Sequence, residues 1–366
     1  MKPFRLPRWR FMNCCGHVWG HDDPPGGATA EGASRRDFLR TAAAGVAALA
    51  AAGGPRSAGA QVRVFPPPPP AASPIEGLID FHAHTAPDVF GRAIDDDESA
   101  QGYMARKAEA IVLKNHVAPT AARAFLLRKH HPGIKAFGGV VLNGPAGGIN
   151  PEAVQWMWRM QGGYGRVVWF PTFDADHHVK HFKDAPEGIK VVGPDGKVLP
   201  AVREVLKICA QQKLVVCTGH ASPEEALAIV EAARDAGCDR IVVTHAEFEV
   251  VNMSVEQMKR AAAMGAKLEI CAMGPLMGPN AHLAWMRHWR QVTYKESADH
   301  IRAVGAEHFL LSTDLGQSGN PSQWDGYAML VAGLMAQGIT KEQIVLMGRD
   351  GPAVSPSATG PAPPGP

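Results

Sequence analysis

The chain has 366 residues, enough for one large domain or two small ones. Hydrophobic residues make up 46% of the chain and charged residues 20%, as in ordinary globular proteins. A formal net charge of +2, without basic runs interleaved with aromatic residues, argues against a nucleic-acid partner. The 16 histidines are the unusual feature, because several of them directly follow apolar runs.

Residues 1–60 have the composition of a leader rather than of a folded domain. The stretch SRRDFL contains Arg35 and Arg36, an Ala/Gly-rich run covers residues 41–54, and the letters AGA precede Gln61. This resembles a twin-arginine signal peptide with an A-x-A-like cleavage site. The apolar run is shorter than the roughly 20 residues that span a bilayer, which predicts removal and no stable membrane span. We therefore expect the twin-arginine export machinery as a partner and a periplasmic or otherwise exported protein, with a disordered cytosolic tail as the alternative.

Two further segments lie outside the predicted domain. Residues 61–74 contain five consecutive prolines, which favour a stiff polyproline II linker. Residues 352–366 are rich in Pro and Gly and predict a disordered tail. The predicted domain therefore spans residues 75–351. Four of its cysteines lack CxxC spacing, and we interpret them as small buried hydrophobic residues: Cys209, Cys217, Cys238 and Cys271.

Short apolar runs rich in branched residues recur through this domain. They are continuously apolar rather than alternating, which predicts strands buried on both faces. The predicted strands are residues 78–81, 110–114, 136–142, 166–170, 214–218, 240–244, 267–271 and 308–312.

Amphipathic helical segments separate the predicted strands. Two of them begin at Ser222 and Ser254, where Glu225 and Gln257 complete capping boxes. Regular alternation of strands and helices predicts a (β/α)8 TIM-like barrel, with an open doubly wound sheet as the alternative. Between the fourth and fifth strands we expect an inserted β-hairpin around Pro194-Asp195-Gly196. A longer loop with a short helix is expected between the seventh and eighth strands.

Polar residues follow the predicted strands at their carboxyl ends, where barrels of this type carry their functional groups. In strand order they are His82 and His84; Lys114 and His116; Asn143; Thr172 and Asp174; His220; His245 and Glu247; Glu269; and Thr313 and Asp314.

His82 and His84 are two residues apart on one strand, so both side chains point to the same face and can bind one ion. His220 and Asp314 would complete a shell of three nitrogens and one oxygen, with a position left for water. Such ligands suit one Zn²⁺, with Fe²⁺ or Mn²⁺ as alternatives. The ion would lower the pKa of bound water to about 7.

This arrangement resembles the amidohydrolase superfamily of metal-dependent hydrolases, over residues 78–348. The motif DFHAH matches the first-strand motif of that superfamily, which implies His82 and His84 as metal ligands. The resemblance further implies His220 as the fifth-strand ligand, His245 as the sixth-strand histidine and Asp314 as the acid that contacts metal and shuttles a proton. The stretches HTAPDVFGR, AIVLKNHVAPT and GHASPEE more closely resemble an amidohydrolase-like family of undefined function.

The fourth strand departs from the superfamily pattern, because no Lys or Glu follows it to bridge two metals. Asp174 or His177 could substitute, but a site with one metal is simpler. The stretch IVLKNH lies where the polymerase-and-histidinol-phosphatase family has a T-D-H motif. His116 would then bind a second metal, and the substrate would be a phosphoester.

Lys114, Arg92 and Glu247 each have more than one interpretation. Lys114 either binds a substrate anion, bridges metals if modified, or pairs with Glu247 or Glu269. Arg92 either binds an anion or lies in a solvated loop. Glu247 either orients His245 or faces solvent. Three histidines are interpreted as a surface cluster: His177, His178 and His181.

Together these features predict an exported hydrolase in which metal-activated water attacks the carbonyl of a small-molecule amide, ester or lactone. His82, His84, His220 and Asp314 would hold the metal, with Asp314 and His245 as the catalytic residues. A phosphoesterase, a metal-dependent decarboxylase or lyase, and a barrel that binds metal and ligand without turnover remain alternatives. A homo-oligomer is left open.

Overall fold

The computed structural model describes residues 73–352. The predicted signal peptide and leader, the Pro-rich linker up to residue 72 and the tail from residue 353 lie outside the described residues. Within the described part of the chain, no helix is both long and apolar enough to cross a membrane.

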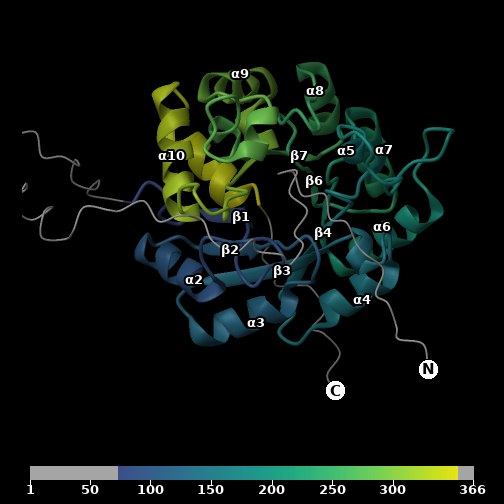
Figure 1. The fold of residues 1–366 in the computed structure, drawn as a ribbon, viewed down its shortest axis with the longest axis horizontal. Coiled ribbons are helices and arrows are strands. Elements are labelled where there is room, and N and C mark those ends of the chain that lie inside the picture. Colours follow the sequence, from purple (N-terminus) through teal and green to yellow (C-terminus); the bar gives the residue numbers. More distant parts are fainter. Residues whose placement is uncertain (1–72, 353–366) are drawn as a thin grey trace, which may run out of the picture. The chain divides into compact units, whose positions relative to one another are not determined.

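Eight parallel strands follow one another in chain order around a nearly closed barrel (Figure 1). Beyond β8, the amide of Asp314 donates to the carbonyl of His82 at 2.7 Å, and the amide of His84 donates to Leu315 at 2.9 Å, which brings the chain back to β1. The predicted barrel is therefore confirmed over the open sheet, and each strand overlaps the run that predicted it. The strands are β1 (Ile79–Ala83), β2 (Ala110–Leu113), β3 (Lys135–Val141), β4 (Gly165–Trp169), β5 (Val215–Cys217), β6 (Ile241–Val243), β7 (Lys267–Cys271) and β8 (Phe309–Ser312).

Helices alternate with these strands and surround them (Figure 1). The predicted capping boxes at Ser222 and Ser254 are both present and begin two of the helices. The last helix continues into a π-helical turn, Leu346–Asp350. The helices are α2 (Asp96–Ala105), α3 (Ala121–His130), α4 (Pro151–Arg159), α5 (Asp176–Val179), α6 (Pro200–Gln212), α7 (Pro223–Asp235), α8 (Val255–Ala263), α9 (Tyr294–Val304), α10 (Gln323–Ala336) and α11 (Lys341–Val345).

The predicted β-hairpin between β4 and β5 is reduced to a single antiparallel bridge. The amide of Gly193 donates to Lys197 at 2.8 Å, and Val192 and Val198 form an isolated antiparallel bridge. Pro200 begins α6 directly afterwards, so too few residues remain for a longer ladder. The insertion between β7 and β8 contains two short 3₁₀ helices, Gly274–Leu276 and Ala284–His288, ahead of α9.

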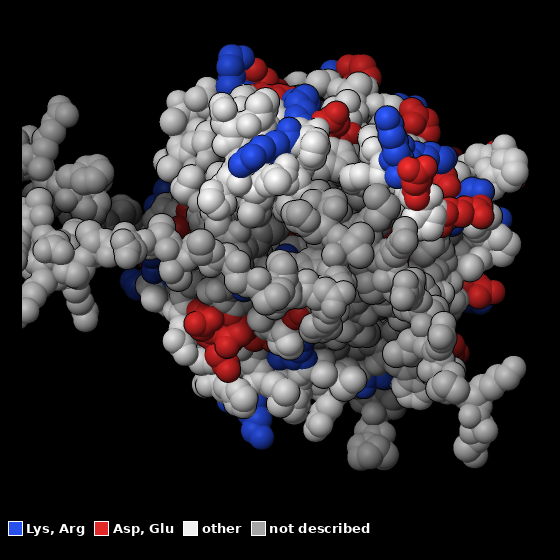
Figure 2. Space-filling view, viewed as in Figure 1, with Lys and Arg blue, Asp and Glu red and all other residues white. Residues whose placement is uncertain are grey.

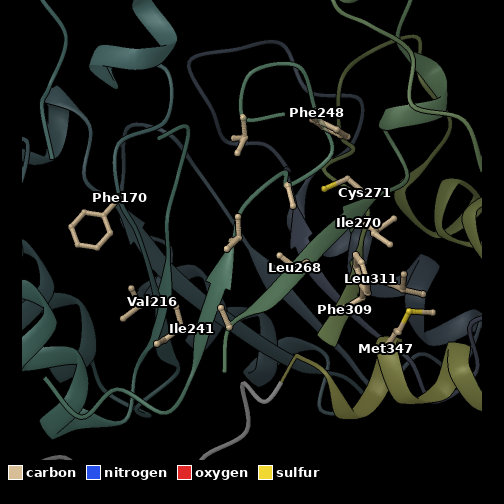
Figure 3. Close-up of a cluster of buried hydrophobic side chains, with 14 of the residues drawn as sticks. Phe170, Val216, Ile241, Phe248, Leu268, Ile270, Cys271, Phe309, Leu311 and Met347 are labelled. Atoms are coloured by element: carbon tan, nitrogen blue, oxygen red, sulfur yellow. The ribbon is translucent and has the colours of Figure 1, made fainter. Parts of the chain in front are cut away.

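Two layers of apolar side chains explain why the strands are continuously apolar. Alternate residues face the barrel interior, among them Phe81, Val112, Phe137, Trp169 and Leu310. The residues between them face the helices. Figure 3 shows part of this outer layer, with Leu268, Ile270 and Leu311 of β7 and β8 near Met347 of the π-helical turn. Successive strand residues point to opposite faces, and here both faces are buried.

A β-bulge in β1 sets the direction of the two predicted metal ligands. Asp80 pairs with Ile111 and Ala83 pairs with Leu113, so β1 carries one residue more than β2 between these pairs. Ile79 and Phe81 face the interior before the bulge. The extra residue shifts the alternation, so that His82 and His84 also face the interior.

Asp80 stabilises this bulge from the outer side of β1. Its carboxylate accepts hydrogen bonds from the amide of His82 at 3.0 Å and from the amide and hydroxyl of Thr313 at 2.9 and 2.6 Å. The hydroxyl of Tyr103 donates to it as well. Burial raises the pKa of Asp80 to about 6, although these hydrogen bonds oppose the rise.

Replacing Asp80 with alanine should lower the free energy of unfolding by more than about 3 kcal/mol, because several buried donors lose their acceptor. Urea denaturation of the purified chain measures this loss. Asp80→Asn keeps one acceptor oxygen and should lose less. A loss below about 1 kcal/mol for the alanine variant would show that the bulge does not depend on this carboxylate.

Candidate metal centre

Three ligand atoms meet at the carboxyl ends of β1 and β8. His82 Nε2 lies 3.1 Å from His84 Nε2, and Asp314 Oδ1 lies 3.0 Å from His82 Nε2 and 3.1 Å from His84 Nε2. We call these atoms the ligand triangle. A metal ion about 2.1 Å from each of its ligands separates neighbouring ligand atoms by about 3.0 Å at right angles and about 3.4 Å in a tetrahedron. The triangle therefore has the dimensions that a divalent metal requires.

Glu269 of β7 fixes the orientation of His82. Its Oε1 lies 2.9 Å from His82 Nδ1 and also accepts a hydrogen bond from the Ser312 hydroxyl at 2.9 Å. A proton on Nδ1 leaves Nε2 with a free lone pair in the triangle, the arrangement typical of metal-binding histidines. Burial alone would raise the pKa of Glu269, but the charge and hydrogen bond of His82, with His245 and Lys114, lower it to about 2.

His84 lacks such an acceptor. Its Nδ1 lies 3.3 Å from Nη2 of Arg92, whose Nε donates to Asp88 at 2.8 Å. A guanidinium can only donate, so it favours a proton on the other ring nitrogen of His84. Burial and the nearby Arg92 lower the pKa of His84 well below its usual value. His82 is thus the better prepared of the two ligands.

Lys114, at the end of β2, places a buried amine beside the triangle. Its Nζ lies 2.9 Å from His82 Nε2 and 5.6 Å from the ring centre of Trp169. Burial lowers the pKa of Lys114, while Asp314 and Glu269 oppose the change. Of the two partners predicted for Lys114, Glu269 acts on it and Glu247 lies elsewhere.

The buried charges around the triangle favour a cation. The pKa of Asp314 is held well below its usual value, because His82 and His245 outweigh the effect of burial. The pKa of His82 is raised, because Asp314 and Glu269 outweigh burial and Lys114. The two carboxylates therefore favour positive charge at the triangle, which a bound metal would supply.

His220 and His245 lie beside the triangle rather than in it. His245 Nε2 is 3.5 Å from Asp314 Oδ2, and the ring centres of His245 and His220 are 5.3 Å apart. His220 Nδ1 lies 2.9 Å from His178 Nδ1. Burial, with His178 as a further cause, lowers the pKa of His220 well below its usual value.

The prediction that His178 belongs to a surface cluster is wrong. Its side chain is buried, and burial lowers its pKa to about 3. His177 is half-buried and His181 is exposed. His178 lies in α5, where the rings of His220 and Trp289 pack against it.

Aromatic rings cover this group of histidines. Phe173 stacks on His116 with ring centres 4.0 Å apart, and Phe248 stacks on His245 at 4.6 Å. The ring centre of Trp289 lies 6.0 Å from that of His178. These rings limit the access of water to the histidines.

Three other predicted site residues have different partners. His116 Nδ1 lies 2.9 Å from the Thr172 hydroxyl, and its ring centre lies 4.8 Å from that of His84. Asp174 accepts a hydrogen bond from the amide of Gly144 at 2.7 Å. Glu247 lies 2.7 Å from His300 Nδ1 and accepts the Ser297 hydroxyl at 2.7 Å, so it contacts α9 instead of orienting His245.

The fold and the site define a (β/α)8 barrel with a buried cluster of histidines and carboxylates at the carboxyl ends of its strands. A family model matches residues 77–269, more than half of the 366 residues. The chain belongs to this family, DUF6282, a family of unknown function. No curated protein matches the chain.

Solved structures with a similar fold include enzymes. An amidohydrolase from Pseudomonas aeruginosa matches with a TM-score of 0.51 and 12% identity, covering 77% of this chain and 96% of that chain. The organophosphorus hydrolase from Deinococcus radiodurans matches with a TM-score of 0.48 and 15% identity, over 76% and 91% of the two chains. At 12% identity, the likeness to the amidohydrolase supports the barrel fold but does not identify the reaction.

Proposed function

We propose that the protein is a metal-dependent hydrolase that acts on the carbonyl of a small-molecule amide, ester or lactone. The ligand triangle carries this proposal, because three ligand atoms 3.0–3.1 Å apart are buried beside two ionised carboxylates. Zn²⁺ is the proposed ion, with Fe²⁺ or Mn²⁺ as alternatives. When bound, the ion would polarise a carbonyl oxygen and supply hydroxide at neutral pH.

Residues of the chain have separate roles in the proposed reaction. Asp314 has one oxygen in the triangle and the other 3.5 Å from His245 Nε2, which suits it to take a proton from the attacking water and return it to the leaving group. Lys114 places its charge where negative charge develops on the substrate oxygen. His245 would hydrogen-bond the same oxygen. The stacked Phe173 and Phe248 reduce the local dielectric constant and strengthen these interactions.

Asp314→Asn tests this division of roles. On a substrate found by screening esters, lactones and amides, kcat/KM should fall by about 10²–10⁴-fold, the usual contribution of general acid–base catalysis. Thermal stabilisation by the same ligand should persist in the variant. Full activity of Asp314→Asn would remove the residue from the mechanism. Ligand-induced stabilisation without turnover in the unaltered chain would instead support a non-catalytic binding barrel.

The other predicted functions have less support. A phosphoesterase with His116 as a metal ligand is disfavoured, because His116 belongs to neither cluster of potential ligand atoms found within residues 73–352. A decarboxylase or lyase would use the same triangle and is separated from a hydrolase by product analysis. Figure 2 shows Lys and Arg interspersed with Asp and Glu where the described residues are visible, without a broad basic surface among them.

Export through the twin-arginine machinery to the periplasm is also part of the proposal. It rests on the SRRDFL stretch, the Ala/Gly-rich run and the AGA sequence before Gln61. Cell fractionation with N-terminal sequencing tests it, and a full-length chain that stays in the cytoplasm would contradict it.

A further inference from the structure

A second group of buried ligand atoms lies next to the triangle. One atom each of His82, His245, Glu269 and Cys271 lies within 4.8 Å of the others, and all four residues are buried. His245 Nδ1 is 3.3 Å from Cys271 Sγ and 3.5 Å from Glu269 Oε2. A ligand set that contains a thiol is chemically different from the triangle.

The backbone of β6 and β7 brings His245, Glu269 and Cys271 together. Glu269 and Cys271 are two residues apart on β7, so both point to the same face. His245 follows β6 with a φ of 52°, a left-handed conformation that is costly for a residue with a Cβ. Its ring lies stacked on Phe248, which Figure 3 labels beyond Cys271 at the end of β7.

The sulfur–nitrogen separation fits a metal ion. With metal–sulfur and metal–nitrogen bonds of about 2.3 and 2.1 Å, sulfur and nitrogen ligands lie about 3.1–3.6 Å apart. The 3.3 Å between Cys271 Sγ and His245 Nδ1 falls in this range.

This group can act independently of the triangle, because Glu269 has two oxygens with separate partners. Its Oε1 binds His82 and Ser312, whereas its Oε2 faces His245. His245, Glu269 Oε2 and Cys271 therefore supply three ligands without taking any atom of the triangle.

We propose that His245, Glu269 and Cys271 form a second metal position, which takes a thiophilic divalent cation such as Zn²⁺, Co²⁺ or Cd²⁺. Thiolate together with imidazole favours such ions over Mg²⁺ or Ca²⁺. On binding, the sulfur–hydrogen bond of Cys271 breaks, a sulfur–metal bond forms and one proton passes to solvent.

Cobalt titration of the full-length chain tests this position. Cys14 and Cys15 are replaced with serine throughout, because they could also bind cobalt, and resident metal is first removed with a chelator. Thiolate-to-cobalt charge-transfer absorption in the near ultraviolet then reports metal bound to cysteine. The proposal predicts this absorption in the parent protein, its loss in Cys271→Ser and its retention in Cys217→Ser, a matched buried cysteine outside the group.

His84→Ala separates this proposal from the proposed function. It removes a ligand of the triangle and should leave the charge-transfer absorption intact, so failure of the triangle would not abolish the signal. If Cys271→Ser does not fold, Glu269→Gln keeps the thiol and should weaken the cobalt affinity of the absorbing species about tenfold or more. A folded parent protein without the absorption, its persistence in Cys271→Ser, or an unchanged affinity in Glu269→Gln would each overturn the proposal.

Discussion

Alanine at His82 should lower metal affinity at the ligand triangle by more than about 100-fold. This exceeds the loss expected when a residue that only hydrogen-bonds a metal ligand is removed. Alanine at His84 should cost less. The reason is the second nitrogen of each ring: Glu269 accepts the Nδ1 proton of His82, while Arg92 donates toward Nδ1 of His84. Competition between the metal-free protein and a chromophoric chelator for Zn²⁺ measures the two affinities.

His288→Ala provides the matched control, because this histidine is exposed. It should bind Zn²⁺ as the unaltered chain does. An unchanged affinity in His82→Ala would exclude His82 as a ligand. A larger loss in His84→Ala than in His82→Ala would instead show that the tautomer argument is wrong.

The metal-free protein should be much less stable at pH 5 than at pH 7. Burial lowers the pKa of His178 to about 3 and that of His245 to about 4, against the effect of Asp314 and Glu269 on His245. The unfolded chain therefore takes up protons first as the pH falls below about 6.5, and the stability of the folded state is lost. These two histidines together lower the free energy of unfolding by about 4 kcal/mol between pH 7 and pH 5.

Other groups modify this loss without reversing it. Burial also lowers the pKa of His84, His116 and His220 well below the usual value, which increases the loss. The raised pKa of Asp80, about 6, increases the free energy of unfolding by about 1 kcal/mol over the same range. The raised pKa of His82 acts in the same direction. Urea denaturation of chelator-treated protein at the two pH values gives the net change. Equal or greater stability at pH 5 would mean that these histidines are not held neutral.

The barrel could be predicted from the sequence because each strand is a continuous apolar run and each run is buried on both faces. The pairing of His82 with His84 followed from strand periodicity. Their inward direction did not, because it depends on the bulge at Asp80. A bulge of this kind depends on the register with β2 and on the hydrogen bonds to Thr313, which are distant in sequence.

Several residues of the site could not be predicted from the sequence. Ser312 and Cys271 resemble ordinary core residues, and only their contacts with Glu269 and His245 distinguish them. The burial of His178 could not be predicted, because it depends on packing against His220 and Trp289, which are distant in sequence. Spacing of two from Glu269 on the same strand was the one available signal for Cys271.

The metal content of the full-length chain, purified without chelator, tests the central claim most directly. Elemental analysis of the unaltered chain should find zinc, iron or manganese at the triangle, and His82→Ala/His84→Ala should lose that equivalent. Cys271→Ser, measured in parallel, identifies any metal held by the second position. Metal content that is unchanged in the double variant, or no metal under any loading condition, would contradict a metal centre at the ligand triangle.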